Sequence, residues 1–304
     1  MWLAFAFLSA ALLGFYDVSK KYSLRGNAVI PVLFLNTLFC SIIFLPMAFR
    51  TPFGGWEMQR YILLKACIVL SSWLLGYIGI KYLPITIVGP INATRPVMVL
   101  VGALLIFGER LNYWQWAGVL LAILSFYLLS RSGKKEGIDF KHNRWILCTV
   151  GAAVLGAISG LYDKYLMATE GGLGLPRLTV QCWYNFYQTL MMGAMLLWWK
   201  KSLPLRGEVL PSGQAQAEGG GPSFRWRWSI LLISVFLSVA DYVYFYSLSL
   251  DGALISVVSM VRRSSVLVSF VLGALLFHEK NLRSKAIDLA LVLLSMFLLW
   301  LGQE

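Results

Sequence analysis

Three arginines lie inside apolar stretches of this sequence, where a charged side chain is least expected. Arg95 follows Asn92 by three residues near the middle of one stretch, and Arg262 and Arg263 lie at a comparable depth in another. An arginine at the centre of a membrane helix costs about 2.5–3.5 kcal/mol on insertion scales, so these side chains should face a wet cavity or a partner. A guanidinium presents parallel donors to the oxygens of a carboxylate or phosphate. The pattern therefore predicts an anion-binding site.

Helix geometry limits which of these residues can share the site. Residues three apart lie on one helix face, so Asn92 and Arg95 can act together. Neighbouring residues diverge by about 100° around a helix, so Arg262 and Arg263 cannot both point at one spot. We expect Arg95 and one of Arg262 and Arg263 to converge on a single cavity.

Acidic residues in the apolar runs offer a structural alternative, in which carboxylates neutralise the arginines and fix helix packing. Asp17, Asp163 and Asp241 are the acids concerned, and Asp241 is the most isolated of them, which makes it a candidate carrier of a coupling proton. Lys20 and Lys21 follow Asp17 by three and four residues, a spacing that predicts a local ion pair. Both readings hold together if ion pairs exchange during transport.

Aromatic side chains are the remaining candidates for a substrate path. Trp73, Tyr77 and Tyr244 lie within or close to the apolar runs and could line the cavity. The alternative is the ordinary aromatic belt that anchors helices at membrane interfaces.

Composition identifies the class of protein. Of 304 residues, 59% are hydrophobic and only 13% are charged, about half the charged share of a soluble domain. We therefore expect a multi-pass integral membrane protein. The formal net charge of +12 comes from basic clusters between apolar runs, which favours contact with anionic lipid headgroups. With no recognition motif present, nucleic acid is not an expected partner.

About ten apolar runs, each long enough to be a membrane helix, divide the chain. Residues 1–130 hold five of them, 131–144 form a polar, basic linker, and 145–304 hold five more. A Gly/Pro/Ser-rich loop at 200–225 should be mobile and outside the membrane. The expected runs cover 1–24, 28–49, 61–81, 85–107, 113–130, 145–167, 177–199, 226–250, 253–277 and 286–300.

The two halves carry related motifs in the same order. Gly14-Phe15-Tyr16-Asp17 matches Gly160-Leu161-Tyr162-Asp163, and Gly102-Ala103-Leu104-Leu105 matches Gly273-Ala274-Leu275-Leu276. Five helices per repeat force the second copy to enter the membrane with the opposite orientation. We therefore predict an all-α membrane fold of two inverted five-helix repeats, an architecture typical of secondary transporters with a midplane site between the repeats.

Two such units resemble the EamA repeats of the drug/metabolite transporter superfamily. Gly14 to Lys21 matches the family signature late in the first helix, and Gly108-Glu109-Arg110-Leu111 is similar to the family's G-E-R-L motif. In the second copy, His278-Glu279-Lys280-Asn281 lacks the glycine. The resemblance implies a central cavity among ten helices and a metabolite as substrate, such as an amino acid, a nucleotide sugar or a sugar phosphate.

An intramembrane enzyme is the rival class. Tyr16-Asp17 and Tyr162-Asp163 are similar to one motif of intramembrane aspartyl proteases, but the Gly-x-Gly-Asp motif is absent. Both histidines, His142 and His278, fall in or beside loops, so no serine–histidine dyad or histidine metal site forms at membrane depth. No catalytic constellation can be assembled. We expect no enzymatic activity, no cofactor and no metal.

The sequence thus predicts a secondary active transporter that moves a small anionic or zwitterionic metabolite by alternating access. The alternatives are an exporter of neutral or cationic compounds with structural arginines and, more distantly, an intramembrane enzyme. We expect a multi-pass protein of the bacterial plasma (inner) membrane, with lipids, a small-molecule substrate and a coupling proton as candidate partners, and with a homodimer left open. The family resemblance favours cytoplasmic termini, whereas the distribution of Lys and Arg favours external ones.

Overall fold

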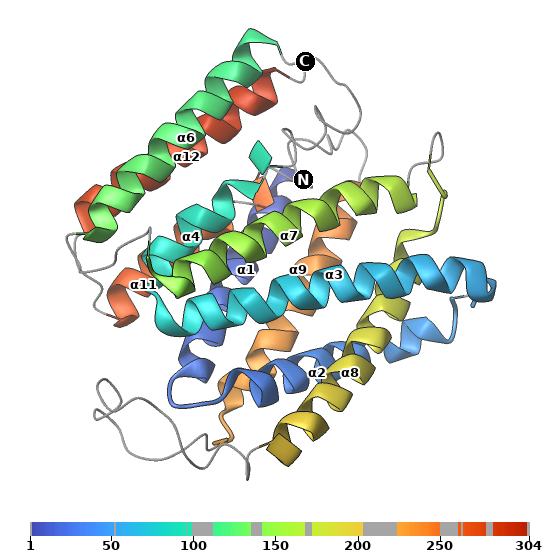
Figure 1. Cartoon of the computed structure of the whole chain (residues 1–304). Helices are drawn as coiled ribbons and strands as arrows, with labels where there is room; N and C mark the ends of the chain where they lie inside the picture. The colour runs from blue at the N-terminus through green and yellow to red at the C-terminus, as the bar shows by residue number, and fades with distance from the viewer. Residues whose placement is uncertain are drawn as a thin grey trace.

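The structure, a computed structural model, is helical throughout the residues that it describes: 2–51, 53–95, 97–98, 112–134, 142–167, 172–202, 224–249, 261–262, 264–277 and 282–302. No strand occurs among these residues (Figure 1). The ten helices are α1 (Trp2–Leu24), α2 (Val29–Ala48), α3 (Gly55–Tyr82), α4 (Ile85–Ala93), α6 (Tyr113–Lys134), α7 (Arg144–Met167), α8 (Arg177–Ser202), α9 (Trp228–Ser249), α11 (Ser265–Phe277) and α12 (Leu282–Leu301).

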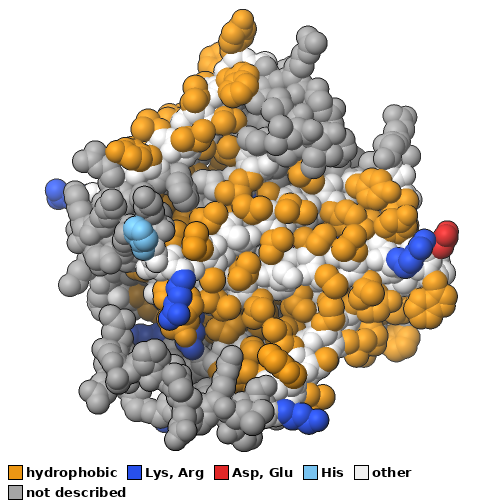
Figure 2. Space-filling view, in the orientation of Figure 1, with side chains coloured by type: hydrophobic (Ala, Val, Ile, Leu, Met, Phe, Trp, Pro, Cys, Tyr) orange, Lys and Arg blue, Asp and Glu red, His pale blue; other side chains and the backbone are white. Residues whose placement is uncertain are grey.

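The helices expose apolar side chains where a soluble protein would expose polar ones. In Figure 2, hydrophobic side chains cover the visible face over α3 and α7, and lysines and arginines lie toward its margins. By length and composition, the described part of the chain has four helices able to cross a membrane: Trp2–Leu24, Val29–Ala48, Gly55–Tyr82 and Arg144–Asp163. The predicted all-α integral membrane fold is confirmed.

The most extensive helix contacts join the two halves of the chain. Helix α1 packs on α9, and its counterpart in the second half, α7, packs on α3, the counterpart of α9. Helices α2 and α6 pack on their own counterparts α8 and α12, and α4 packs on α11. Exchanging the halves therefore reproduces the pairing, as two repeats related by a two-fold axis require. Figure 1 shows two of these pairs, α3 beside α7 and α6 beside α12.

Buried serine hydroxyls bind these pairs through the backbone of the opposite helix. Ser9 Oγ donates to the Ala240 carbonyl of α9 at 2.8 Å, and Ser72 Oγ of α3 donates to the Ala152 carbonyl of α7 at 2.8 Å. Ser125 Oγ of α6 donates at 2.7 Å to the carbonyl of Asp288 on α12. Small hydroxyl residues let helix backbones approach closely in lipid and supply hydrogen bonds there. These bonds set the register of each pair.

Two helices expected to run unbroken are interrupted at matching places. Helix α4 ends at Ala93 and Thr94 forms a turn, so the helix expected over 85–107 is not continuous. Before α11, Ser264 forms a similar turn. Each hydroxyl donates to the carbonyl three residues earlier, Thr94 Oγ1 at 2.7 Å and Ser264 Oγ at 2.6 Å. Next to Thr94, proline at position 96 has no amide hydrogen to continue the helix. Arg95 and Arg262 therefore each lie beside an interruption of a helix.

Other helix boundaries differ by a few residues from the expected ones. Helix α3 begins at Gly55 rather than Tyr61, because the left-handed Gly54 and Gly55 turn the chain directly into the helix. Helix α12 begins at Leu282 rather than at residue 286. Helix α6 continues to Lys134, into the predicted linker at 131–144. Most of the linker and of the 200–225 loop lies outside the described residues.

The contact of α4 with α11 depends on Gly273. A Cβ at this position would overlap the side chain of Ile85, which is buried and β-branched and so has little freedom to move aside. We expect Gly273→Ala to destabilise the protein by about 1–3 kcal/mol, the usual cost of overpacking a core. A lower midpoint of thermal unfolding in detergent would show this.

Two further variants make this prediction specific. Gly273→Ala combined with Ile85→Ala removes the overlapping methyl and should recover part of the loss. Gly193→Ala places its Cβ 3.6 Å from Phe34, an ordinary contact, and should leave the midpoint near that of the wild type. A Gly273→Ala protein as stable as wild type would contradict the close approach of α4 and α11.

Candidate functional site

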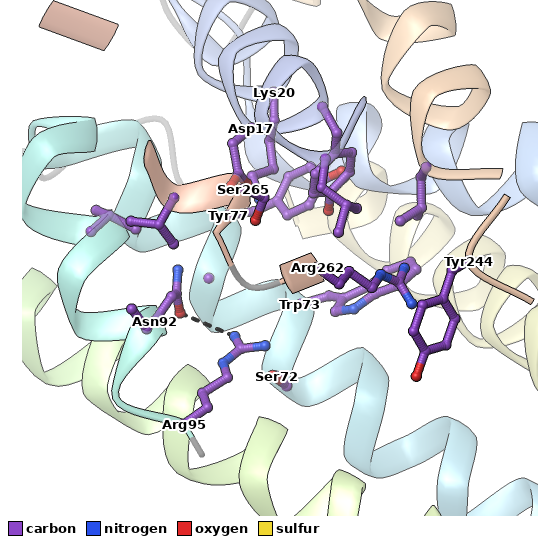
Figure 3. A pocket seen from close by; sticks show the side chains of 17 residues that line it. Asp17, Lys20, Ser72, Trp73, Tyr77, Asn92, Arg95, Tyr244, Arg262 and Ser265 are labelled. Carbon is purple, nitrogen blue, oxygen red and sulfur yellow. Dashed lines mark hydrogen bonds and ion pairs between the residues drawn. The ribbon is translucent and has the colours of Figure 1, made fainter. Parts of the chain in front are cut away.

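A cavity of about 350 Å³ lies among α1, α3, α4 and α9 and the residues around the Ser264 turn. Charged and aromatic side chains project into it from several helices (Figure 3). Its lining consists of Leu13, Tyr16, Asp17, Lys20, Ser72, Trp73, Gly76, Tyr77, Val88, Asn92, Ala93, Arg95, Leu237, Tyr244, Arg262, Ser265 and Val266.

Arg95 is held at the edge of this cavity by two features of its neighbours. Its Nη2 donates to Asn92 Oδ1 at 3.1 Å, as the three-residue spacing allows (Figure 3). Its guanidinium lies against Gly156 of α7, where a Cβ would be 2.8 Å from Arg95 Cζ. The Nε atom is buried without a hydrogen-bond partner. No ion pair to Arg95 occurs among the described residues, and within that part of the chain its charge is uncompensated.

Arg262, in contrast, is compensated. It forms an ion pair with Asp241 of α9, and its guanidinium stacks over the Tyr244 ring with Cζ 4.4 Å from the ring centroid. Gln181 of α8 donates to the other Asp241 oxygen at 3.5 Å. Asp241 is therefore not the isolated acid that the sequence indicated. Its pairing with Arg262 is the structural alternative stated for that arginine.

The acid on α1 is also paired. Asp17 accepts a hydrogen bond from Lys20 at 2.8 Å, and Lys20 Nζ lies 4.3 Å from the ring centroid of Tyr16. Lys21 does not join this pair: it donates to the backbone carbonyls of Ile80, at 2.7 Å, and of Leu83. Lys21 thus caps the end of α3, where a cation is favoured by the helix dipole.

Asp163 lies on the equivalent turn of α7, but it has a partner that sequence reasoning missed. Lys65 of α3 is buried, with its Nζ 2.5 Å from Asp163 Oδ2 and 2.6 Å from Ser159 Oγ. Neither Lys65 nor Asp163 lines the cavity. A lysine inside an apolar run of α3 was the available signal, because such a residue needs a partner.

The charge of the cavity follows from these pairs. The ion pairs Asp17–Lys20 and Asp241–Arg262 each sum to zero, which leaves Arg95 as the uncompensated charge of the described lining. The Tyr77 hydroxyl, which also lines the cavity, is buried without a partner. Buried polar atoms are usually hydrogen-bonded, so unpartnered ones are available to a ligand. The site can therefore bind one anionic group at Arg95.

A family comparison bears on this helix arrangement. Residues 1–131 match the model of the EamA-like transporter family. The first half of the chain is therefore similar to an EamA-like transporter unit. A protein of Archaeoglobus fulgidus described as an uncharacterized transporter is 28% identical over 137 residues, and the alignment covers 42% of this chain. The chain spans about half of that relative, 48% of its length.

The likeness of fold extends beyond the EamA-like unit. A solved crystal structure matches 99% of this chain and 98% of its own, with a TM-score of 0.61 and 12% sequence identity. This similarity supports one ten-helix architecture for both halves, in agreement with the exchange symmetry of the helix contacts.

The predicted site residues fall into three groups relative to the cavity. Its lining includes Asn92, Arg95, Arg262, Trp73, Tyr77, Tyr244 and Asp17. Asp241 is joined to the lining through Arg262, whereas Lys21 and Asp163 form the contacts described above. Arg263, residues 108–111 and residues 278–281 lie outside the described part of the chain. Lys20 and Ser72 line the cavity without having been predicted to, and no described group of histidines, cysteines or acids could hold a metal.

The space that Gly156 leaves for Arg95 generates a prediction. An alanine Cβ would lie 2.8–3.0 Å from three guanidinium atoms. Because these are the end of a flexible side chain, we expect Gly156→Ala to fold normally but to displace the guanidinium. Anion affinity should fall about tenfold, as when a hydrogen bond to a charged group is lost. Binding of organic anions to purified protein measures this.

Gly151→Ala on the same helix is the matched control. Its Cβ would meet only the end of the Leu75 side chain, at 3.2 Å, so anion affinity should stay at the wild-type value. Equal affinities for wild type and Gly156→Ala would show that the position of the Arg95 guanidinium does not determine binding.

Proposed function

We propose that the protein is a secondary active transporter that moves a small organic monoanion across a bacterial plasma membrane by alternating access. The observation that carries this proposal is Arg95: a guanidinium beside a cavity, oriented by Asn92 and Gly156, with no carboxylate among the described residues to neutralise it. Uncompensated charge at membrane depth is costly and is retained for binding or transport.

Charge balance favours a monoanion over a zwitterion or a dianion. A zwitterion needs a free carboxylate for its ammonium group, but Asp17 and Asp241 already hold Lys20 and Arg262. A dianion needs a second uncompensated cation, whereas the described lining offers Arg95 alone. The remainder of the lining is aromatic and aliphatic, with Trp73, Tyr77 and Tyr244 around the charged groups. An anion with an aromatic or apolar body suits such walls.

The arrangement of the helices supports alternating access. Inverted repeats can exchange conformations, so that a site between them opens to one face and then to the other. The interruptions at Thr94 and Ser264 lie next to Arg95 and Arg262, and discontinuous helices form the sites of many transporters. The match to the EamA-like transporter family is in keeping with this function.

Replacing Arg95 tests the proposal. Purified protein in liposomes is assayed with a panel of carboxylates, sulfonates, amino acids, sugar phosphates, cations and neutral compounds. We expect monoanions to be transported and Arg95→Gln to lower kcat/KM for them by about a hundredfold, since about 3 kcal/mol of charge-assisted hydrogen bonding is lost. Arg95→Lys, which keeps the charge but not the planar fork, should retain a part of the activity.

An unchanged thermal midpoint for Arg95→Gln would separate loss of binding from loss of fold. Transport of cations or neutral compounds, with the same rate in the wild type and in Arg95→Gln, would refute anion transport and favour the exporter with structural arginines.

Variants of Arg262 and Asp241 test whether their ion pair is purely structural or whether Arg262 also binds the anion during transport. Arg262→Gln or Asp241→Asn alone leaves a charge without its partner, and each should cost up to about 3 kcal/mol, the lower end for buried pairs because both side chains keep some exposure. The double variant should recover the thermal midpoint.

The double variant is also assayed for transport. If Arg262 leaves Asp241 to bind the anion during the transport cycle, the anion affinity of the double variant should stay several-fold below that of the wild type. Recovery of both stability and affinity would show that the ion pair is structural only.

A further inference from the structure

Asp288 of α12 is a buried acid away from the cavity. Its residue surface is 2% exposed, and its Oδ2 atom has no hydrogen-bond partner. It is not ion-paired with Lys285, the lysine one turn earlier on the same helix. The apolar faces of α12 next to it include Ile287 and Leu294, which are exposed toward the surrounding lipid. A carboxylate left unpaired in such surroundings is far less favourable than a neutral carboxylic acid.

Lys285 connects this acid to the helix that carries the anion site. It is fully buried, and its Nζ donates to Thr86 Oγ1 of α4 at 2.9 Å. Lys285 and Asp288 are three residues apart and therefore share one face of α12. Helix α4 leads from Thr86 to Asn92 and then to Arg95. A change at Asp288 can thus reach the cavity through a contact between α12 and α4.

The other described groups around Asp288 do not stabilise its charge. Helix α6 contributes the Ser125 hydroxyl, which is bonded to the Asp288 backbone carbonyl, and its tyrosines Tyr113 and Tyr127 are exposed. Helix α4 contributes the Thr86 hydroxyl. On α12 itself Arg283 is exposed. Among the described side chains of these helices, Lys285 is the buried charged group on the same face as Asp288.

We propose that Asp288 is the binding site of a coupling proton, which is carried together with the anion. The carboxylate takes one proton from water in the outward or inward state and returns it to water on the other side. While Asp288 is neutral, Lys285 stays bonded to Thr86, and α4 keeps the position in which Asn92 and Arg95 face the cavity. Ionised Asp288 would attract Lys285 away from Thr86 and release the first turn of α4.

Proton and anion then favour the same conformation, and each must raise the affinity for the other, because coupling between two sites is reciprocal. This inference rests on the proposed function. One proton and one monoanion carry no net charge, so transport should follow a pH gradient and be indifferent to membrane potential.

The first test measures binding of benzenesulfonate, an aromatic anion that stays charged across the accessible pH range, so that pH acts only on the protein. The affinity of the wild type should rise at least about fivefold as the pH falls, the lower end of ordinary coupling between sites. Asp288→Asn, which mimics the neutral acid, should bind tightly at every pH. An equal pH dependence in Asp288→Asn would overturn the proposal.

The second test separates coupling from transport itself, in liposomes. Exchange of internal for external benzenesulfonate needs no net proton movement, and we expect it in both wild type and Asp288→Asn. Accumulation driven by an inward proton gradient should occur in wild type and be lost in Asp288→Asn. No exchange by wild type would count against the proposed function, whereas exchange without gradient-driven accumulation would overturn the proton site alone.

A third measurement needs no ligand. The infrared spectrum of the wild type at about pH 5, where surface acids stay mostly ionised, should contain the carbonyl band of a buried, protonated carboxyl, and this band should be missing in Asp288→Asn. Glu57→Gln, which removes an exposed surface acid of α3, is the matched control and should keep the band. A wild-type spectrum without the band would overturn the proposal.

Discussion

The cost of charge inside a membrane is the constraint on which this structure depends. Most charged side chains of the described helix interiors have polar partners: Lys20 and Arg262 pair with carboxylates, Lys21 donates to backbone carbonyls, and Lys285 donates to a hydroxyl among its contacts. Arg95 borders the same cavity as Lys20 and Arg262, but its described neighbours are an amide and a bare glycine rather than a carboxylate. Because the other basic side chains of the described lining are paired with carboxylates, Arg95 is the candidate for contact with a ligand.

The two halves share a helix pattern but not a charge pattern. Asp17 and Asp163 occupy equivalent turns of α1 and α7, yet Asp17 pairs within its own helix and Asp163 pairs across to α3. Both broken helices carry an arginine at the break, but only the second arginine, Arg262, has an acid facing it. Symmetry therefore sets where the helices lie, while the residues that differ between the halves set where the described lining carries an unpaired charge.

The sequence was sufficient to predict most of the helices and several of the residues that line the cavity, because apolar length and misplaced charge are local properties. Arg95, Asn92, Arg262 and Tyr244 were recognised on those grounds, and they border one cavity. Partners were harder to predict, since they depend on which helices touch. The contact of Gly156 with Arg95 requires the packing of α7 on α4, which no spacing within either helix reveals.

The position at which α12 begins also determines the surroundings of Asp288, and the sequence did not predict it. A helix that begins at residue 286 leaves Lys285 outside it and places Asp288 in its first turn. Because α12 begins at Leu282, Lys285 and Asp288 instead lie on one buried face of the helix. Because the expected helix start was one turn too late, the sequence did not predict that Lys285 and Asp288 are both buried in the helix bundle.

The pairing of helices between the halves has a consequence for how the protein is made. In all the dominant pairs, a helix of the first half lies on a helix of the second, and serine hydroxyls of one half bond to carbonyls of the other. A half inserted alone would present these hydroxyls and carbonyls to lipid, with no partner until the other half is synthesised. The first half can therefore complete its native packing only when the second half is also present in the membrane.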